Sequence, residues 1–289
     1  MIRLQRRQQS AGDLGSVVRT MKALSTANIS QYQMAVASLQ MYYRTISLGL
    51  YASFQRGQLA VIGEEGKQRK PTNVAVIFGS DQGLVGRFND SVAEFGQQAL
   101  LHLPGQLETW AVGERVYYLL ADAGLTPTRL FHVPNSVSAI TPLVHDILIK
   151  SEQYRQNNQD YRFYIVHNRP LNDEGYRQTS QQLYPPDNKW QEQITDLQWP
   201  SENLPQVVGA TEDTLRALIR EYLFVSIYKA CAESLAAENA SRLAAMQRAE
   251  KNIDEMLEEL KLSYNKLRKS TIDAELFDVI AGFEALGGR

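Results

Sequence analysis

The sequence predicts a small α/β domain set between two long helices, which we expect to pair as an antiparallel coiled coil. Apolar residues near both ends of the chain recur at steps alternating between three and four, the spacing of a helical seam that meets another helix. Between these ends, short apolar strands alternate with helices, a pattern typical of a mostly parallel sheet. We expect a coiled-coil helix over 1–57, an α/β domain over 72–205 and a second coiled-coil helix over 210–287.

The first helix carries its apolar seam in two stretches separated by a slip of phase. The first stretch is Leu14, Val17, Met21 and Leu24, and the second is Ile29, Tyr32, Val36, Leu39, Tyr43, Ile46 and Leu50. Gly12 and Gly15 each cost about 1 kcal/mol against alanine, so the start of this helix is either locally weak or closely packed. Four helix-breaking residues end the run: Gly57, Gly63, Gly66 and Pro71.

The last helix is longer and has clear start signals. Thr211 is a good N-cap, and Glu212 and Asp213 follow in the first turn, where the helix dipole favours negative charge. No proline occurs between residues 211 and 286, and one helix of this length would extend roughly 110 Å. Such a helix needs a partner along most of its length, and the first helix is the obvious one. Its seam, with one slip of phase, is Met246, Ala249, Ile253, Met256, Leu260, Tyr264, Leu267, Ile272, Leu276, Val279 and Phe283.

The central segment alternates between strand and helix signals. We expect strands over 73–78, 107–112, 129–133, 161–166 and 178–184, and helices over 89–102, 114–123 and 138–156. Alternation at this interval predicts a Rossmann-like α/β domain with a mostly parallel, five-stranded sheet. Pro185 and Pro186 stop the last strand.

Charge and cysteine content exclude several classes of protein. The net charge of -2 argues against nucleic-acid binding by the molecule as a whole. Residues 1–56 hold seven basic residues and one acidic residue, a net charge of +6, so the rest of the chain carries -8. A basic first helix is expected to seek an acidic surface. The single cysteine, Cys231, excludes an internal disulfide, and the four dispersed histidines have no metal-ligand spacing.

Targeting signals are also missing. The longest apolar runs fall short of the ~18 residues that a membrane-spanning helix needs. The first residues are too basic and too polar for the apolar stretch of a signal peptide. The chain is therefore expected to be soluble.

The most enzyme-like feature is the glycine-rich loop from Gly79 to Gly86, between a predicted strand and a predicted helix. A dinucleotide-binding loop belongs at this place, because phosphate can approach the helix N-terminus there. The glycine spacing does not match G-x-G-x-x-G, no Lys-Ser/Thr pair follows, and Asp81 would repel phosphate. A structural turn is therefore the favoured interpretation, with a nucleotide site as the alternative.

Other catalytic patterns are missing too. The sequence has neither a G-x-S-x-G elbow nor an H-E-x-x-H zinc helix. Cys231 lies in the middle of the last helix and is interpreted as a packed thiol, while Glu255, Glu258 and Glu259 are interpreted as a solvated helix face. We expect no catalytic residue, no cofactor and no metal. Five basic residues fit either solvent or an acidic partner: Arg19, Lys22, Arg242, Arg268 and Lys269.

Several motifs together resemble a known family. The last helix contains AENASRLAAM over 237–246, KN at 251–252 and YNKLR over 264–268, followed by Ile272, Glu275 and Leu276. This helix resembles the C-terminal helix of the gamma subunits of F-type ATP synthases. RTMK over 19–22 is similar to a segment of the family's first helix, and DQGLVGRFN over 81–89 to its loop after the first strand. The matching loop positions are Asp81, Gly83, Leu84, Gly86 and Asn89.

The resemblance implies a rotor that makes no bonds itself. In the family, the coiled coil is an axle inside a ring of alternating alpha and beta subunits, and catalysis resides in beta. The globular part stands on the membrane c-ring with the epsilon subunit, on the cytoplasmic or equivalent face of an energy-transducing membrane. The implied partners are those subunits, with one copy of this chain per complex and no nucleic acid. The implied ring contacts are Arg19, Met21, Lys22, Arg242, Met246, Arg268, Ile272 and Glu275.

The sequence also departs from the family pattern. STANISQYQ over 25–33 replaces a run rich in lysine, threonine and small residues, and Gly86-Arg87 replaces a glycine pair. These departures indicate a divergent branch, such as the alternative type that some bacteria and archaea carry beside their main synthase, and leave proton and sodium as candidate coupling ions. Two other interpretations stay open, a Rossmann-type nucleotide-binding enzyme and a coiled-coil adaptor unrelated to an ATPase.

Overall fold

The computed structural model describes residues 2–54, 71–157, 160–171, 175–203 and 211–287. It divides into two compact units, one formed by residues 26–242 and one by residues 1–25 with 243–289. Two long helices contribute to both units, α1 (Ile2–Phe54) and α6 (Thr211–Gly287). The predicted limits at residues 57, 205 and 210 lie outside the described residues, as does the side chain of Thr211 that was expected to cap α6.

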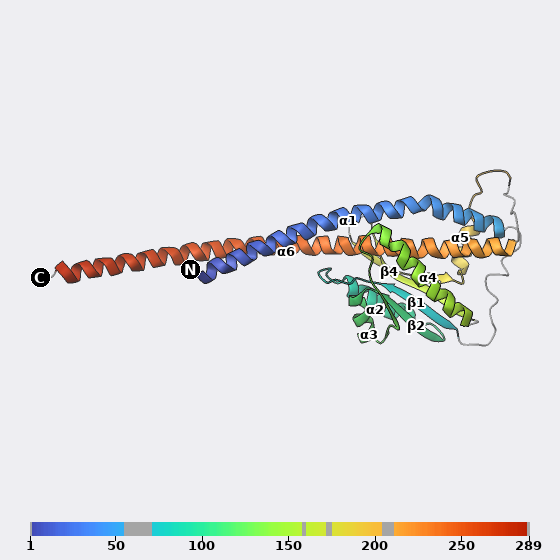
Figure 1. The fold of residues 1–289 in the computed structure, drawn as a ribbon, viewed down its shortest axis with the longest axis horizontal. Coiled ribbons are helices and arrows are strands. Elements are labelled where there is room, and N and C mark those ends of the chain that lie inside the picture. Colours follow the sequence, from blue (N-terminus) through green and yellow to red (C-terminus); the bar gives the residue numbers. More distant parts are fainter. Residues whose placement is uncertain (1, 55–70, 158–159, 172–174, 204–210, 288–289) are drawn as a thin grey trace. The chain divides into compact units, whose positions relative to one another are not determined.

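The larger unit is built on a five-stranded sheet with the strand order β3-β2-β1-β4-β5 (Figure 1). The strands are β1 (Thr72–Phe78), β2 (Gln106–Val112), β3 (Arg129–Phe131), β4 (Tyr161–Pro170) and β5 (Tyr176–Tyr184). All neighbouring pairs are parallel except β4 with β5, which is antiparallel. The predicted mostly parallel sheet of five strands is confirmed.

Helices cover both faces of this sheet. They are α2 (Phe88–Leu100), α3 (Glu114–Asp122), the 3-10 turn η2 (Val137–Ala139), α4 (Ile140–Asn157) and α5 (Asn188–Thr195). Ala75 and Ile77 of β1 pack with the buried side chains of α2 and α3. Val74, Val76 and Phe78 point to the other face, where α4, α5, α6 and α1 pack. Because side chains alternate along a strand, β1 is buried on both faces, as expected of a central parallel strand.

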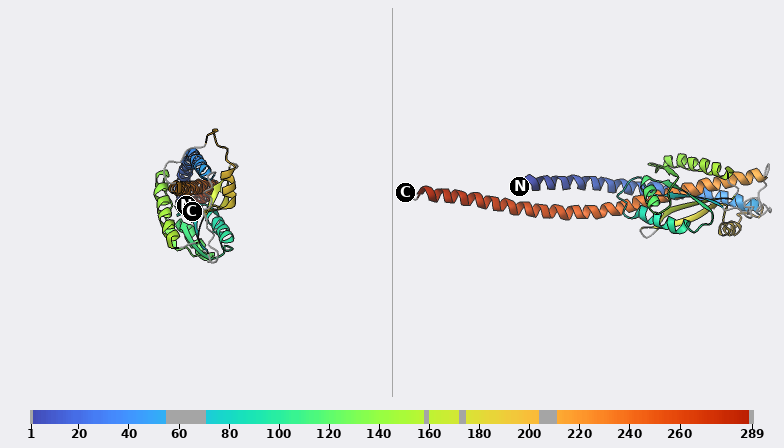
Figure 2. Two further views of the ribbon diagram at one scale, coloured as in Figure 1. Left: turned by 90° about the vertical axis from the view of Figure 1, so that its right-hand side faces the viewer. Right: turned by 90° about the horizontal axis from the view of Figure 1, so that it is seen from below.

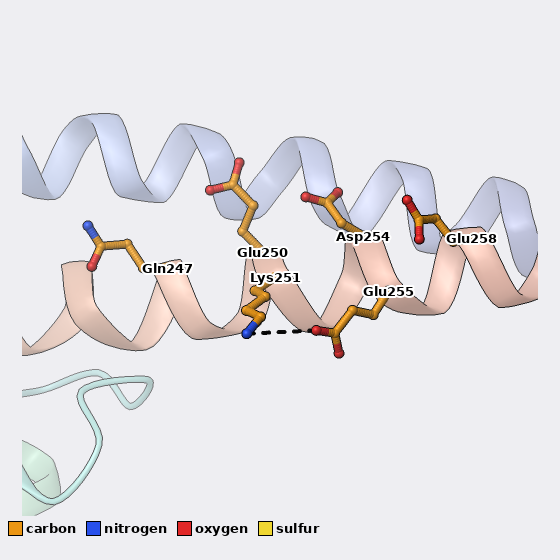
Figure 3. A pocket seen from close by; sticks show the side chains of 6 residues that line it. All are labelled: Gln247, Glu250, Lys251, Asp254, Glu255 and Glu258. Atoms are coloured by element: carbon orange, nitrogen blue, oxygen red, sulfur yellow. Dashed lines mark ion pairs between the residues drawn. The ribbon is translucent and has the colours of Figure 1, made fainter.

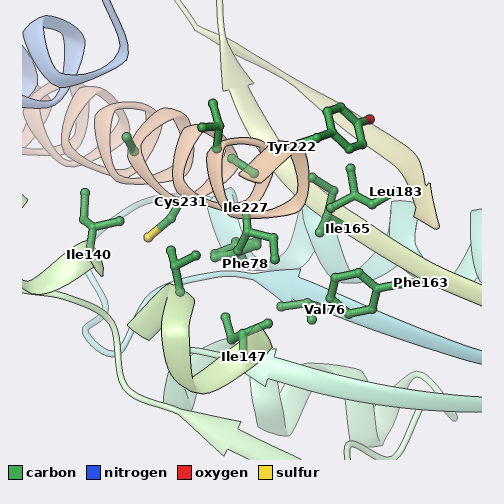
Figure 4. Packing of buried hydrophobic residues seen from close by; sticks show 14 of the residues in the cluster. Val76, Phe78, Ile140, Ile147, Phe163, Ile165, Leu183, Tyr222, Ile227 and Cys231 are labelled. Carbon is green, nitrogen blue, oxygen red and sulfur yellow. The ribbon is translucent and has the colours of Figure 1, made fainter. Parts of the chain in front are cut away.

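The core between the sheet and the long helices contains the middle of α6. Figure 4 shows Tyr222, Ile227 and Cys231 of α6 beside strand residues such as Ile165 and the α4 residue Ile147. Cys231 is fully buried, and burial raises the pKa of its thiol, which fits the packed thiol predicted from the sequence. The second apolar stretch of α1 packs in the same core through its buried residues Tyr32, Ile46 and Leu50.

Within the smaller unit, α1 and α6 run antiparallel side by side (Figure 2). Gln5 Nε2 donates a hydrogen bond to Tyr264 Oη at 3.2 Å, and Lys22 Nζ lies 2.6 Å from Glu250 Oε2. A small apolar cluster between the two helices contains Val18 of α1 with Met246 and Ile253 of α6. The predicted pairing of the first helix with the last is therefore confirmed.

Of the four residues in the first apolar stretch of α1, Met21 packs against the cluster with α6, and the other three do not form the contact that their spacing suggested. Leu14, Val17 and Leu24 are 54%, 54% and 59% exposed, respectively. The contact is made instead through Gly15 and Val18, and a Cβ on Gly15 would lie 3.4 Å from Ile253 Cγ2. Small side chains let two helices approach closely, so this face forms the interface and the larger apolar residues stay outside it.

Candidate functional site

The glycine-rich loop between β1 and α2 is held by side chains of its own unit. Asp81 accepts two backbone hydrogen bonds, from Glu114 N at 2.9 Å and from Val133 N at 3.0 Å. Asn89 Oδ1 accepts from Ser80 N at 2.9 Å, and Asn89 Nδ2 donates to Ser80 Oγ at 2.8 Å. These bonds tie the loop to the start of α3, to the segment after β3 and to α2.

This geometry favours the structural turn over a nucleotide site. The Asp81 carboxylate occupies the N-terminus of α3, where a bound phosphate would meet its negative charge. Gly79 is explained by packing, because a Cβ there would lie 2.3 Å from Val116 Cβ. The glycine is therefore needed for close approach of β1 to α3, without any ligand.

The loop also docks on α6. Ser241 Oγ donates a hydrogen bond of 2.6 Å to the backbone oxygen of Val85, and the buried side chains of Val85 and Phe88 pack against Ala237. The two motifs that carry the family resemblance, 81–89 and 237–246, thus contact each other directly. This contact could not be predicted from the sequence, because the two residues lie more than 150 positions apart.

Arg242 is held by a neighbour on the same helix. Its Nη2 donates to Glu238 Oε1 at 2.5 Å, and the two side chains are only 12% and 7% exposed. Burial raises the pKa of Glu238, and the positive charge of Arg242 opposes that rise. Burial also raises the pKa of the adjacent Tyr32 hydroxyl on α1, with the Glu238 charge adding to the rise. Arg242, predicted from the sequence as a partner contact, therefore presents little free surface.

Sequence reasoning missed a second buried cluster one turn earlier on α6. His167 Nε2, on β4, donates a hydrogen bond of 2.9 Å to Glu233 Oε2, and both side chains are buried. Lys229 Nζ and Arg169 Nε lie 3.9 Å and 3.6 Å from Glu233 Oε1. Burial alone would raise the pKa of Glu233, but the His167 hydrogen bond and the surrounding positive charges lower it. No sequence spacing connects His167 with a residue 66 positions away.

The other predicted partner contacts lie in the smaller unit. Arg19 is exposed, Lys22 is half-buried and paired with Glu250, and Met21 packs beside the buried Met246. On the later part of α6, Arg268, Ile272 and Glu275 are all exposed. The structure therefore brings Met21 and Met246 into one cluster and leaves Arg268, Ile272 and Glu275 on the helix surface.

Exposed apolar side chains gather on the last described turns of α6. Because Gln5 lies beside Tyr264, the first described residue of α1 is reached about one turn further along α6. Beyond that point, five large apolar side chains are 44–70% exposed: Ile272, Leu276, Phe277, Val279 and Ile280. Isolated exposed apolar residues are ordinary, but a contiguous run of this kind marks a contact surface.

A shallow groove on α6 is lined by polar and charged side chains rather than apolar ones. It is lined by Gln247, Glu250, Lys251, Asp254, Glu255 and Glu258, as Figure 3 shows. Lys251 and Glu255 form a wide ion pair of 3.9 Å, and both side chains are exposed. This face is polar and solvated, as the sequence predicted for Glu255 and Glu258. Among the described residues, no group of three or more His, Cys, Asp or Glu could hold a metal ion.

Comparison with known proteins gives one consistent result. A family model described as ATP synthase matches residues 1–286. The ATP synthase gamma chain of Wolbachia sp. subsp. Drosophila simulans is 26% identical over 274 residues, covering 93% of each chain. The gamma chain of Wolbachia pipientis subsp. Culex pipiens is 30% identical over 218 residues, covering 73% of this chain and 72% of the relative.

A solved structure has the same fold. The rotor of the Euglena gracilis mitochondrial ATP synthase matches with a TM-score of 0.63 at 15% identity, covering 93% of this chain and 97% of that chain. Since the family model spans nearly the whole chain and one relative is 30% identical over more than two thirds of both chains, the chain belongs to the ATP synthase gamma-chain family.

Proposed function

We propose that this central-stalk subunit of ATP synthase turns inside a ring of alpha and beta subunits and couples ion flow to ATP synthesis or hydrolysis. The exposed apolar run from Ile272 to Ile280 carries the proposal. Each Å² of apolar surface removed from water contributes about 25 cal/mol, so this run favours an apolar sleeve around the helix. A ring that encloses the last turns of α6 supplies such a sleeve.

The polar contacts proposed for the ring are the accessible ones among the predicted residues. Arg19 on the basic first helix, with Arg268 and Glu275 on α6, can reach charged groups of a surrounding subunit. Lys22 is half-buried and already pairs with Glu250, so it would contribute to such a contact as part of that ion pair. Ile272 would add an apolar contact, and Met21 a partial one. Met246 and Arg242 are buried within the chain, so we propose that they support the helix surface from beneath.

The remaining assignments follow from the family. The chain is part of the rotary ATP synthase complex, and we propose that the beta subunits perform catalysis. We propose the epsilon subunit and the membrane c-ring as further partners, with one copy of the chain per complex. ATP synthase is a membrane-associated complex, and within the described ranges no helix is both long and apolar enough to cross a bilayer. The proposed place is the face of the membrane on which the catalytic ring stands.

The two other interpretations lose their support. The Rossmann-type enzyme depended on the loop from Gly79 to Gly86, whose Asp81 carboxylate is held at the N-terminus of α3 and would repel a phosphate there. The adaptor unrelated to an ATPase is not favoured, because the family match covers both long helices and the domain between them. The assignment to a divergent branch and the identity of the coupling ion stay predictions. Stimulation of ATP hydrolysis by Na⁺ in the complete complex would test whether sodium is the coupling ion.

Reconstitution tests the proposal. The cognate alpha and beta subunits are purified with and without this chain, and ATP hydrolysis is followed under identical conditions. We expect the chain to co-purify at one copy per ring and to be required for sustained hydrolysis. A ring that forms and hydrolyses ATP equally well without binding the chain would contradict the proposal and favour the adaptor.

A further inference from the structure

The C-terminal part of α6 carries a second row of side chains, on a different face of the helix from the one that meets α1. Tyr264 faces α1 through its hydrogen bond with Gln5. Leu262 precedes Tyr264 by two residues and is therefore about 200° away around the helix, because each residue of an α-helix turns by about 100°. From Leu262 the row continues at steps of three and four, the spacing of a helical seam. We call this row the outer seam, and its members are Leu262, Asn265, Lys269, Ile272, Leu276 and Val279.

The outer seam is apolar and uncovered over most of its length. Four of its six side chains are large and apolar, and they are 51–70% exposed: Leu262, Ile272, Leu276 and Val279. Leu262 faces away from α1, and the other three lie beyond the level at which the described part of α1 begins, about one turn past Tyr264 (Figure 1). The phase slip in the sequence thus marks the change from the seam that meets α1 to a seam that has no partner within the described chain.

Charged side chains flank the outer seam in two groups of opposite sign. Lys266 and Arg268 precede its midpoint, and Asp273 and Glu275 follow it. All four side chains are exposed. When two such helices run antiparallel about a two-fold axis at the midpoint, the basic group of each lies beside the acidic group of the other. The seam is therefore complementary in charge to an antiparallel second copy of itself.

One register satisfies both the apolar and the charged positions, with the two-fold axis between residues 270 and 271. The flanking charges then form two kinds of ion pair between the copies, Arg268 with Glu275 and Lys266 with Asp273. The seam residues meet in three unlike pairs, each formed twice: Leu262 with Val279, Asn265 with Leu276, and Lys269 with Ile272. A parallel pair would instead bring Lys269 against Lys269 inside the seam, where two like charges repel. The antiparallel arrangement places the Lys269 stem on Ile272 and leaves its ammonium group in water.

We propose that this chain, outside the ATP synthase complex, binds a second copy of itself through the outer seam of α6 as an antiparallel dimer. The interface is isologous, because the same residues contribute from both copies. Ile272, Leu276 and Val279 also belong to the run that we propose the ring encloses, so a chain can occupy either the dimer or the ring. The dimer thus covers the apolar run of a chain that has not been assembled, and this exclusion, unlike the dimer itself, rests on the proposed function.

Sedimentation equilibrium of the isolated full-length chain tests the dimer. We expect the wild-type mass to rise with concentration from 32.6 kDa towards twice that value. Glu275→Arg should raise the dissociation constant about tenfold or more, because it replaces two ion pairs by two contacts between arginines. Asp278→Arg makes the same change of charge on the side of α6 away from the outer seam, about 200° from Leu276, and should leave the dissociation constant unchanged. Circular dichroism checks that each variant keeps the helix content of the wild type.

Charge exchange and cross-linking test the register. Combining Glu275→Arg with Arg268→Glu restores the ion pairs with their charges exchanged, so the double variant should dimerise as the wild type does. A mixture of two single variants, Leu262→Cys and Val279→Cys, should form a disulfide-linked dimer under mild oxidation. Leu262→Cys alone should not, because the two copies of that position lie roughly 25 Å apart in the antiparallel dimer. The natural thiol of Cys231 is buried and does not interfere.

Three results would overturn the proposed dimer: a mass that stays at 32.6 kDa at every concentration, a double variant that dimerises no more tightly than Glu275→Arg, or a cross-link from Leu262→Cys alone. The last result would show a parallel pair. Failure of the proposed function is a different observation. A chain that dimerises as expected but does not bind the ring of alpha and beta subunits would leave the dimer standing and contradict the rotor.

Discussion

Replacing Arg242 by alanine would leave the Glu238 carboxylate buried without its counter-charge. The two groups lie 2.5 Å apart, and their side chains are 12% and 7% exposed. Removing one partner of a buried pair costs about 3–5 kcal/mol, a large part of the 5–15 kcal/mol that ordinarily holds a domain folded. We therefore expect Arg242→Ala to lower the free energy of unfolding of the larger unit by about 3–5 kcal/mol at pH 8.

The loss should depend on pH in a defined direction. The folded-state pKa of Glu238 is raised by burial, so the folded chain holds this proton more tightly than the unfolded chain, whose value is about 4.3. Removing Arg242 raises that pKa further. The full stability cost of Arg242→Ala is present above the folded-state pKa of Glu238. It shrinks as pH falls through that pKa, because the carboxyl becomes neutral. The deficit of Arg242→Ala is therefore expected to be smaller at pH 5.5 than at pH 8.

Urea unfolding followed by tryptophan fluorescence measures this loss. Trp110, Trp190 and Trp199 all belong to the larger unit, so the signal reports on that unit. Arg216→Ala is the matched control, because Arg216 forms an exposed pair with Glu212 at the same helical spacing, and its loss should cost no more than about 0.5 kcal/mol. An Arg242→Ala deficit as small as that of the control, or one that grows as pH falls, would show that Arg242 does not neutralise a buried Glu238 carboxylate.

Three further predictions concern other parts of the chain. Glu233→Gln should make the stability of the chain less sensitive to acid. The pKa of Glu233 is lowered in the folded state, so its ionised carboxylate stabilises that state above about pH 4.3, and this stabilisation is lost as pH falls. The free energy of unfolding of the variant should therefore vary less below that pH than that of the wild type. A matching slope in both proteins would contradict the His167 contact. Ile253→Ala should cost about 2–4 kcal/mol in the smaller unit, seen as faster proteolysis within 1–25 and 243–289 of the isolated chain, and unchanged proteolysis would refute the α1–α6 contact there. Millimolar ATP, ADP or NADH should not raise the melting temperature of the isolated chain, whereas a dose-dependent rise would revive a nucleotide site at the loop from Gly79 to Gly86.

Much of the fold could be predicted because its local signals agree with its tertiary structure. The strand expected over 73–78 is β1, and the one expected over 107–112 is β2, each extended by one residue. Both are short apolar runs between turn residues, which a buried parallel strand requires. The proline-free stretch from Thr211 likewise became one helix. Helix α5 was missed, because eight mostly polar residues give no periodic apolar signal.

The phase of the first helix could not be predicted from periodicity. Leu14, Val17 and Leu24 form a better apolar seam than Gly15 and Val18, yet the smaller residues face α6. Periodicity counts apolar residues and does not measure how closely two backbones approach, which small side chains decide. The uncovered leucines and valine leave a second apolar face on α1.

The candidate site was predictable where one motif carried it and unpredictable where distant residues meet. The loop motif and the α6 motif were both recognised, but their contact through Ser241 and Val85 depends on the fold. Arg242 was expected to face a partner because the family resemblance implied it, while its charge alone fitted either solvent or an acidic partner. Arg242 instead forms an ion pair with Glu238, one turn earlier on the same helix, and both side chains are buried within the chain.

Rotation of single complexes is the direct test of whether this chain is a rotor. The ring of alpha and beta subunits is fixed to a surface, and a bead is attached through an introduced Ile149→Cys, an exposed position on α4 that remains reactive while Cys231 is buried. With ATP, we expect sustained rotation in one direction with evenly spaced pauses set by the ring's symmetry. A bead that only fluctuates, in complexes that hydrolyse ATP and contain the chain, would contradict a rotor function.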